Sequence, residues 1–194
     1  MTIEEIKHSL KDKSVGIAGC GGLGSNCAVA LARVGIGKLI LADFDRVEEG
    51  NLNRQYFFRD QVGEYKSEAL RDNIIRIDEF LNVEVHVVNL EPESIKAFFA
   101  DCDVIVEAFD EDTAKQMIIE TVLSEMPDKY IVSGQGLAGY GNNEGLRTER
   151  HDNLFIVGDR VSEVSEDQPP LGPRVGVVAN MQANLVLEIL LNED

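Results

Sequence analysis

The sequence lacks a surplus of positive charge. Its 194 residues include 18 Lys and Arg against 35 Asp and Glu, which gives a formal net charge of −17. A protein that neutralises many phosphates of DNA or RNA needs a basic face, so this composition argues against a nucleic-acid partner. Tryptophan is absent too, but apolar residue types make up 44% of the chain, which is too much for a disordered protein.

Cysteine is scarce as well. Cys20, Cys27 and Cys102 form no Cys-x-x-Cys pair, so we expect no thiolate zinc site. An odd, sparse set of thiols is typical of reduced protein in the cytosol and not of a disulfide framework. We therefore expect a cytoplasmic protein without zinc.

The chain contains no uninterrupted apolar run of membrane-spanning length. Residues 1–8 carry charges where a signal peptide needs an apolar core. The most apolar stretch, residues 175–191, is interrupted by Asn180, Gln182, Asn184 and Glu188. We expect neither a signal peptide nor a membrane span.

The acidic excess is confined to one part of the chain. Residues 1–76 contain 11 basic and 11 acidic side chains, whereas residues 77–194 contain 7 and 24. The first part therefore keeps the cations that an anionic ligand of moderate size requires.

Apolar runs that predict strands alternate with helical patterns along the chain. This alternation predicts an α/β fold with a doubly wound, mainly parallel sheet. The predicted strands lie at residues 15–18, 38–43, 83–87, 104–106, 130–133 and 155–157.

The length of the chain favours one domain over residues 1–194. A capping box at Thr2 and Glu5 opens a helix within residues 1–12. Residues 134–150 are rich in Gly and Asn and predict a loop. Residues 158–173 predict an exposed crossover loop, and residues 174–191 a C-terminal helix.

A glycine cluster follows the first predicted strand. Gly19, Gly21 and Gly24 fit G-x-G-x-x-G before a helix, where they allow a tight turn and close backbone approach to phosphate. Asp43 ends the next strand and can accept hydrogen bonds from ribose hydroxyls. A tight turn without a ligand is the alternative. The pattern alone does not choose between NAD, FAD and ATP.

A long polar connection, residues 44–65, follows Asp43. Its length is typical of a functional segment, and Arg54 and Lys66 bring cations toward the glycine loop. Two cations at this place fit a triphosphate better than a dinucleotide. A solvated polar loop explains the residues equally well.

Several blocks of the sequence together resemble the ThiF/MoeB/HesA family of adenylating enzymes, bacterial relatives of ubiquitin-activating enzymes. The resemblance extends from about residue 14 to residue 191. The blocks that carry it are Gly19–Ser25, Asp43-x-Asp45, Asn51-Leu-Asn-Arg-Gln55, Val62–Lys66, Val104–Asp110, Ser133-Gly134 and Gly172–Gly176.

The resemblance implies a Rossmann-like ATP site. The glycine loop would lie under the phosphates and Asp43 would bind the ribose. Arg54, Lys66 and Asp110 would be the catalytic residues, with Asp110 holding Mg²⁺; a helix N-cap is the alternative for Asp110. The nucleotide-binding residues would be Gly19, Gly21, Gly22, Gly24, Asp43, Asn51, Arg54, Gln55 and Lys66.

The implied reaction is adenylation of the C-terminal glycine carboxylate of a ubiquitin-like sulfur carrier ending in Gly-Gly. Pyrophosphate is released. A carboxylate is already nucleophilic at neutral pH, so no general base is needed. The short form without zinc cysteines resembles the ThiF-type proteins of thiamin synthesis, whose carrier is ThiS. The resemblance also implies a homodimer.

Three departures from the family pattern are visible. The zinc-binding cysteines and the C-terminal cysteine of many members are missing, so Cys20 and Cys102 are expected to be packed thiols. The N-terminal arginine that reaches the partner's site has no clear match. Glu111 stands where an asparagine usually follows the metal aspartate.

Three other functions compete with this interpretation. A tRNA-modifying dehydratase could use the same adenylating site, but the acidic second part of the chain disfavours tRNA. A nicotinamide or flavin protein would explain the glycine loop and Asp43 but would leave Arg54, Lys66 and Asp110 without a role. An inactive regulatory homologue would explain Glu111 and the missing arginine.

Overall fold

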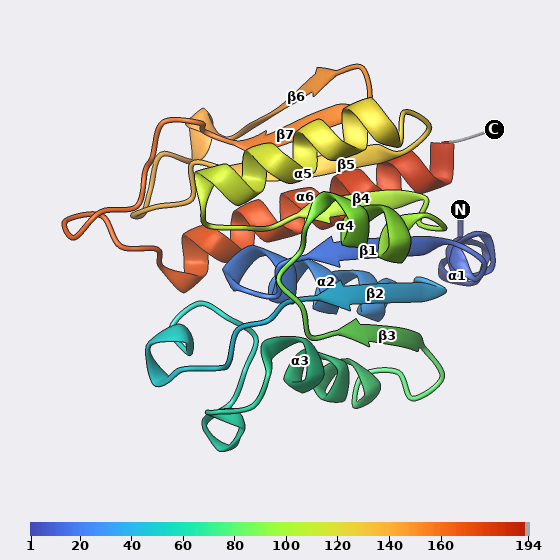
Figure 1. Cartoon of the computed structure of the whole chain (residues 1–194), viewed down its shortest axis with the longest axis horizontal. Helices are drawn as coiled ribbons and strands as arrows, with labels where there is room; N and C mark the ends of the chain where they lie inside the picture. Colours follow the sequence, from blue (N-terminus) through green and yellow to red (C-terminus); the bar gives the residue numbers. More distant parts are fainter. Residues whose placement is uncertain (193–194) are drawn as a thin grey trace.

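A computed structural model of the chain describes residues 1–192. Its seven strands form a single sheet in the order β3-β2-β1-β4-β5-β7-β6, in which β6 alone runs antiparallel (Figure 1). The mainly parallel, Rossmann-like sheet predicted from the sequence is therefore confirmed. The strands are β1 (Ser14–Ala18), β2 (Lys38–Ala42), β3 (Asn82–His86), β4 (Val104–Glu107), β5 (Tyr130–Gln135), β6 (Arg147–His151) and β7 (Leu154–Gly158).

Helices cover both faces of the sheet. In Figure 1, α4 and α5 lie in front of the strands, and α2 and α6 lie behind them. Alternate residues of β2 belong to opposite cores: Leu39 and Leu41 pack with α2, α3 and α6, whereas Ile40 packs with α4 and α5. The helices are α1 (Ile3–Leu10), α2 (Gly22–Val34), α3 (Lys66–Ile75), α4 (Pro92–Phe99), α5 (Asp112–Glu125) and α6 (Gly172–Asn192).

The parallel strands end level with one another, at the left in Figure 1. Ala18 of β1 is in register with Ala42 of β2 and with Glu107 of β4. The glycine loop, residues 44–65 and residues 159–171 all emerge at this edge (Figure 1). Ligands of open α/β sheets bind at this edge, where the strand order reverses.

Two local expectations differ from the structure. The sequence predicts that the glycine motif precedes a helix, but helix α2 begins at Gly22, so the last glycine of the motif lies inside the first helical turn. Residues 134–150 are not only loop, because they include most of β6 and the short 3-10 helix η3 (Asn143–Gly145). The sequence hides β6 because its side chains are polar and mostly exposed, as an antiparallel edge strand allows.

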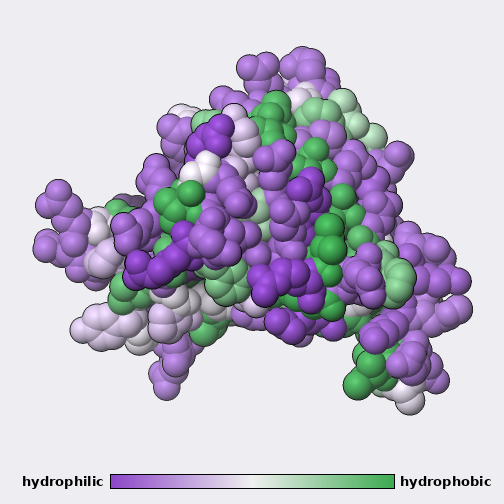
Figure 2. All heavy atoms as spheres, turned by 90° about the horizontal axis from the view of Figure 1, so that it is seen from below, coloured by the Kyte–Doolittle hydropathy of each residue, from purple (hydrophilic) through white to green (hydrophobic). Residues whose placement is uncertain are grey.

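Helix α6 is the one helix of residues 1–192 that is long and apolar enough to cross a membrane by length and composition. Its apolar side chains pack against α2, β4 and β5 instead, with Val175, Val178 and Val186 fully buried. Seen from the side of β3 and α3, the surface is mostly hydrophilic, with hydrophobic residues in narrow separate groups (Figure 2).

Candidate functional site

The glycine loop between β1 and α2 forms a backbone cradle. Gly19 has φ +91°, a left-handed conformation that favours glycine, and a Cβ on Gly24 would lie 1.8 Å from the Gly19 carbonyl oxygen. A Cβ on Gly22 would lie 2.9 Å from Val175 Cγ1, whereas Gly21 is open, with Gln55 Nε2 at 3.6 Å. Because the first amides of α2 have no helical acceptor, the cradle suits an anion.

Asp43 is joined to this loop by its carboxylate. Its Oδ2 accepts a hydrogen bond from the Cys20 amide (2.6 Å), and its Oδ1 accepts one from the Asp45 amide (2.7 Å). Burial raises the pKa of Asp43 above its ordinary value, and these two hydrogen bonds and Lys66 only partly oppose that rise. The side chain lies at the carboxyl end of β2, where the sequence placed a ribose-binding acid.

Lys66 brings a positive charge to the same edge of the sheet. It is the first residue of α3, its side chain is 9% exposed, and its Nζ lies 2.8 Å from Asp45 Oδ2. The Lys66 amide also donates to the Asp45 carbonyl oxygen (2.8 Å). Asp45 thus holds Lys66 through both main chain and side chain, a role that sequence reasoning missed.

Residues 51–55 begin at the last residue of the 3-10 helix η1 (Glu49–Asn51) and contain three of the predicted ATP-binding residues. Asn51 Oδ1 accepts from the Glu48 amide (3.1 Å) and fixes this turn. Arg54 donates to Gly50 O (3.1 Å) and to Asn53 Oδ1 (2.8 Å).

Gln55 is buried, and its Oε1 has no hydrogen-bond partner among the described residues. A buried orphan acceptor beside the glycine loop indicates a place where a ligand completes the hydrogen bonding.

Two side chains of α2 clamp this segment onto the glycine loop. Asn26 Nδ2 donates to Gly22 O (2.7 Å) and to Arg54 O (2.9 Å). Ser25 Oγ donates to Gly21 O (2.6 Å) and accepts from the Tyr56 amide (2.9 Å). Polar residues in the first turn of a helix that is otherwise apolar were the signal for this clamp.

Asp110 follows β4 and lies beside the glycine loop. The Ala108 amide donates to Ala18 O (2.9 Å), and a Cβ on Gly19 would lie 3.2 Å from Phe109 Cδ1. Asp110 is exposed, and its carboxylate has no partner within residues 1–192. The N-cap of α5 is Glu111, so Asp110 does not serve as the helix cap that was its alternative role. A free carboxylate at this edge is a suitable hard ligand for Mg²⁺.

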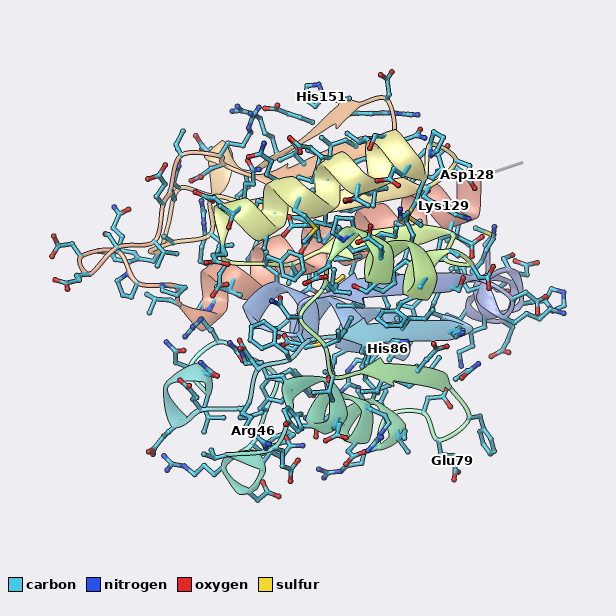
Figure 3. All side chains as sticks on the ribbon, in the orientation of Figure 1. Arg46, Glu79, His86, Asp128, Lys129 and His151 are labelled. Carbon is cyan, nitrogen blue, oxygen red and sulfur yellow. The ribbon has the colours of Figure 1, made fainter. Side chains whose placement is uncertain are left out.

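The histidines and cysteines form no metal-binding cluster within residues 1–192. Figure 3 shows His86 on β3 and His151 on β6, the two edge strands of the sheet. His86 stacks on Phe98 with 3.8 Å between ring centroids, a structural contact.

All three cysteines are free and buried, and burial raises the pKa of Cys27 and of Cys102 to about 12. Neither of these two thiols is poised as a nucleophile.

Comparison with known proteins shows similarity over the whole chain. Residues 2–194 match the ThiF family. Adenylyltransferase and sulfurtransferase MOCS3 of Caenorhabditis briggsae is 32% identical over 191 residues, which is 94% of this chain and 47% of that protein. Ubiquitin-like modifier-activating enzyme 5 of the same organism is 45% identical over 83 residues, 43% of this chain and 19% of that protein. The chain thus spans about half or less of the curated relatives it matches.

Solved structures share the fold. The tRNA N6-threonylcarbamoyladenosine dehydratase TcdA of E. coli, in complex with ATP, superposes with a TM-score of 0.87 at 20% identity and covers 97% of this chain and 89% of its own. MccB of E. coli with ATP superposes with a TM-score of 0.72 at 24% identity, over 95% and 57% of the two chains. At these identities the likeness concerns the fold alone. The match over residues 2–194 identifies this chain as a member of the ThiF family.

Proposed function

We propose that this protein uses ATP to adenylate the C-terminal glycine carboxylate of a ubiquitin-like sulfur carrier and releases pyrophosphate. The observation that carries the proposal is the clamp by Ser25 and Asn26, which joins the glycine loop to the segment bearing Arg54. The clamp holds the backbone of Arg54 beside the glycine loop, and Asp43 and Lys66 lie at the same edge of the sheet, held by the Cys20 amide and by Asp45.

In this proposal the triphosphate lies over Gly19, Gly21, Gly22 and Gly24, and Asp43 receives the ribose hydroxyls. Asn51, Arg54, Gln55 and Lys66 surround the phosphates. The open Gly21 cradle is the feature that fits the phosphates, and the Gln55 Oε1 acceptor fits a hydroxyl or amino donor of the nucleotide.

The chemistry needs charge neutralisation and alignment. A carrier carboxylate oxygen attacks the α-phosphorus, the bond from that phosphorus to the bridging oxygen breaks, and pyrophosphate leaves with the electron pair. No proton is transferred in this step. Arg54 and Lys66 offset the repulsion between the anions and stabilise charge on the departing phosphates.

Asp110 would hold Mg²⁺, which supplies further charge neutralisation on the phosphates when bound. Its exposed carboxylate without a protein partner fits this role, because Mg²⁺ usually takes one or two carboxylates together with phosphate and water. Adenylation in this form uses neither zinc nor an enzyme thiol.

The names of the relatives favour a ubiquitin-like substrate. MOCS3 is an adenylyltransferase and sulfurtransferase, and the second relative is a ubiquitin-like modifier-activating enzyme. For this chain we propose a ThiS-like carrier ending in Gly-Gly, and hence a place in thiamin biosynthesis in the cytoplasm.

We also propose that the protein is a homodimer. Helices α2 and α6 border a groove of about 960 Å³ whose lining includes Pro173, Val177, Met181 and Leu187. Val177 is 44% exposed there. Arg33 and Glu188 lie in the same groove, so a second copy related by two-fold symmetry offers both apolar and opposite-charge partners.

Pyrophosphate exchange into ATP tests the reaction. We expect exchange that requires a carrier ending in Gly-Gly, is abolished by EDTA, and is lost when the terminal glycine is amidated. The control is the same carrier truncated by two residues. Absence of carrier-dependent exchange under every condition would sink the proposal.

The same assay separates the competing functions. A tRNA-modifying dehydratase would instead turn over ATP only with tRNA, and a regulatory homologue would bind partners without exchange. A nicotinamide or flavin protein would bind its dinucleotide more tightly than ATP. The −17 net charge leads us to expect no tRNA binding in a filter assay at physiological salt.

A further inference from the structure

Glu107 is a fully buried carboxylate at the carboxyl end of β4. Carboxylates are seldom fully buried, because an ionised group loses its hydration in the interior unless it is paired and hydrogen-bonded. The proposed reaction uses the end of β4 only through Asp110, so the burial of Glu107 requires its own explanation.

Three elements supply partners to the Glu107 carboxylate. Lys115 Nζ of α5 and Ser133 Oγ of β5 each lie 2.6 Å from Oε2. The Phe109 amide donates to Oε1 at 2.7 Å. Lys115 also donates to the Gly134 carbonyl oxygen (3.1 Å), so the ion pair is anchored on both sides.

The bond from Phe109 fixes the backbone directly before Asp110. No side-chain hydrogen bond or ion pair within residues 1–192 holds the Asp110 carboxylate itself. Its position therefore depends on the turn that the Glu107 carboxylate holds. Phe109 also lies against Gly19, so the same turn borders the glycine loop.

We propose that Glu107 and Lys115 are positioning residues that hold the Phe109–Asp110 turn so that Asp110 meets the metal bound with ATP. This inference rests on the proposed function, in which Asp110 is the metal ligand. Groups that orient a metal ligand commonly change metal affinity about 10–100-fold when removed.

Replacing one member of the pair would leave a buried charge unpaired and destabilise the fold, so the test replaces both. E107Q/K115M removes both charges but keeps an amide oxygen that can accept from the Phe109 amide. E107L/K115M removes the charges and the acceptor together. The control is K96M/E125Q, which removes the exposed ion pair between α4 and α5 (2.5 Å).

Mn²⁺ affinity in the presence of saturating ATP, followed by electron paramagnetic resonance, is the main measurement. Hydrogen exchange of the Phe109 amide reports the turn without metal. We expect E107L/K115M to bind Mn²⁺ about tenfold more weakly and its Phe109 amide to exchange faster. We expect E107Q/K115M to keep most of the wild-type Mn²⁺ affinity and most of the protection of that amide. The control is expected to match the wild type.

The outcomes separate this inference from the proposed function. If D110A lowers Mn²⁺ affinity while E107L/K115M matches the wild type, the positioning role is wrong and the metal role stands. If E107Q/K115M and E107L/K115M lose Mn²⁺ affinity equally, the oxygen that accepts from the Phe109 amide does not position Asp110, and the inference is also wrong. If D110A binds Mn²⁺ like the wild type, Asp110 is not the metal ligand, and the positioning role of Glu107 and Lys115 is wrong with it.

Discussion

Lys66 and Asp110 illustrate two ways of placing a charge at the same edge of the sheet. The Lys66 side chain is almost buried and is held by Asp45 at 2.8 Å, so its charge is fixed in space. The Asp110 carboxylate is exposed and has no partner in the described part of the chain, so it is free to bind a cation. A cation fixed in space, as that of Lys66 is, can stabilise a transition state without reorganisation.

Replacing Lys66 tests the role of the fixed cation. We expect Lys66→Ala to lower the pyrophosphate-exchange rate at least about tenfold, because the cation that offsets the negative charge of the phosphates is lost. Lys38→Ala, which removes a lysine on β2 paired with Glu84, is the control expected to keep the rate. A full rate in Lys66→Ala would show that the cation is misassigned.

Replacing Asp110 tests the proposed metal ligand. We expect Asp110→Ala to lower the exchange rate at least about tenfold and to raise the Mg²⁺ concentration required. Asp101→Ala, an exposed acid before the opposite end of β4, is the matched control. An unchanged Mg²⁺ requirement in Asp110→Ala would contradict the assignment.

At the scale of the element, the start of α6 connects two of the loops at the site edge. Arg174 Nη2 lies 2.6 Å from Asp159 Oδ2, with both side chains at most 3% exposed. Arg174 also donates to Gly141 O (2.6 Å). The Asn53 side chain donates to Pro170 O (3.3 Å), so residues 159–171 are held at both ends.

This buried pair predicts a pH dependence of stability. Burial raises the pKa of Asp159, but hydrogen bonds from Ser162 and Val161 and the charge of Arg174 outweigh it, so the pKa lies below its ordinary value. Such a carboxyl contributes stability that is complete above its unfolded pKa of about 3.9 and is lost as the pH falls through the lower folded pKa.

We therefore expect the free energy of unfolding in urea to fall more between about pH 5 and pH 2 for the wild type than for D159N/R174M.

At pH 7, Arg174→Met alone is expected to lower the free energy of unfolding by about 3–5 kcal/mol, since it leaves a buried unpaired carboxylate. Arg160→Met, which removes an exposed pair with Glu149, is expected to cost at most about 1 kcal/mol. Equal losses of unfolding free energy in Arg174→Met and Arg160→Met would contradict the role given to the buried pair of Arg174 and Asp159.

The close packing of α2 on the glycine loop is also testable. A Cβ on Gly24 would lie 1.8 Å from Gly19 O, so Gly24→Ala must displace the helix or the loop. We expect loss of ATP binding in calorimetry and destabilisation by about 1–3 kcal/mol, as for overpacking. A Cβ on Gly50 meets no atom within 4 Å, so Gly50→Ala should fold normally.

At the scale of the whole molecule, the proposed oligomeric state depends on a single surface. The groove between α2 and α6 is the apolar surface proposed to meet a second copy. We expect Val177→Glu to shift the protein toward monomer in sedimentation at micromolar concentration, because it buries a charge in the interface. Val164→Glu, in the exposed loop, should leave the assembly unchanged. A monomeric wild type would remove the dimer proposal.

The amino-acid sequence was sufficient to predict the fold class and the positions of the loops that we propose bind ATP. Continuous apolar runs such as Leu39–Ala42 are typical of strands that are buried on both faces. Glycines with a positive φ or with backbone in close contact tolerate few replacements, so they also leave a strong local signal. The predicted blocks around Gly19, Asp43, Arg54, Lys66 and Asp110 all lie at or beside one edge of the sheet.

The side chains that hold those blocks in place can be identified only in the folded structure. Asn26, Asp45 and Glu107 each also pair with a residue 8 to 28 positions away in the chain, and such pairings have no local period. The polar edge strand β6 was hidden for the same reason, because its place comes from pairing with β7 and not from its own side chains. Local periodicity encodes burial, whereas polar pairing across elements exists only once the chain has folded.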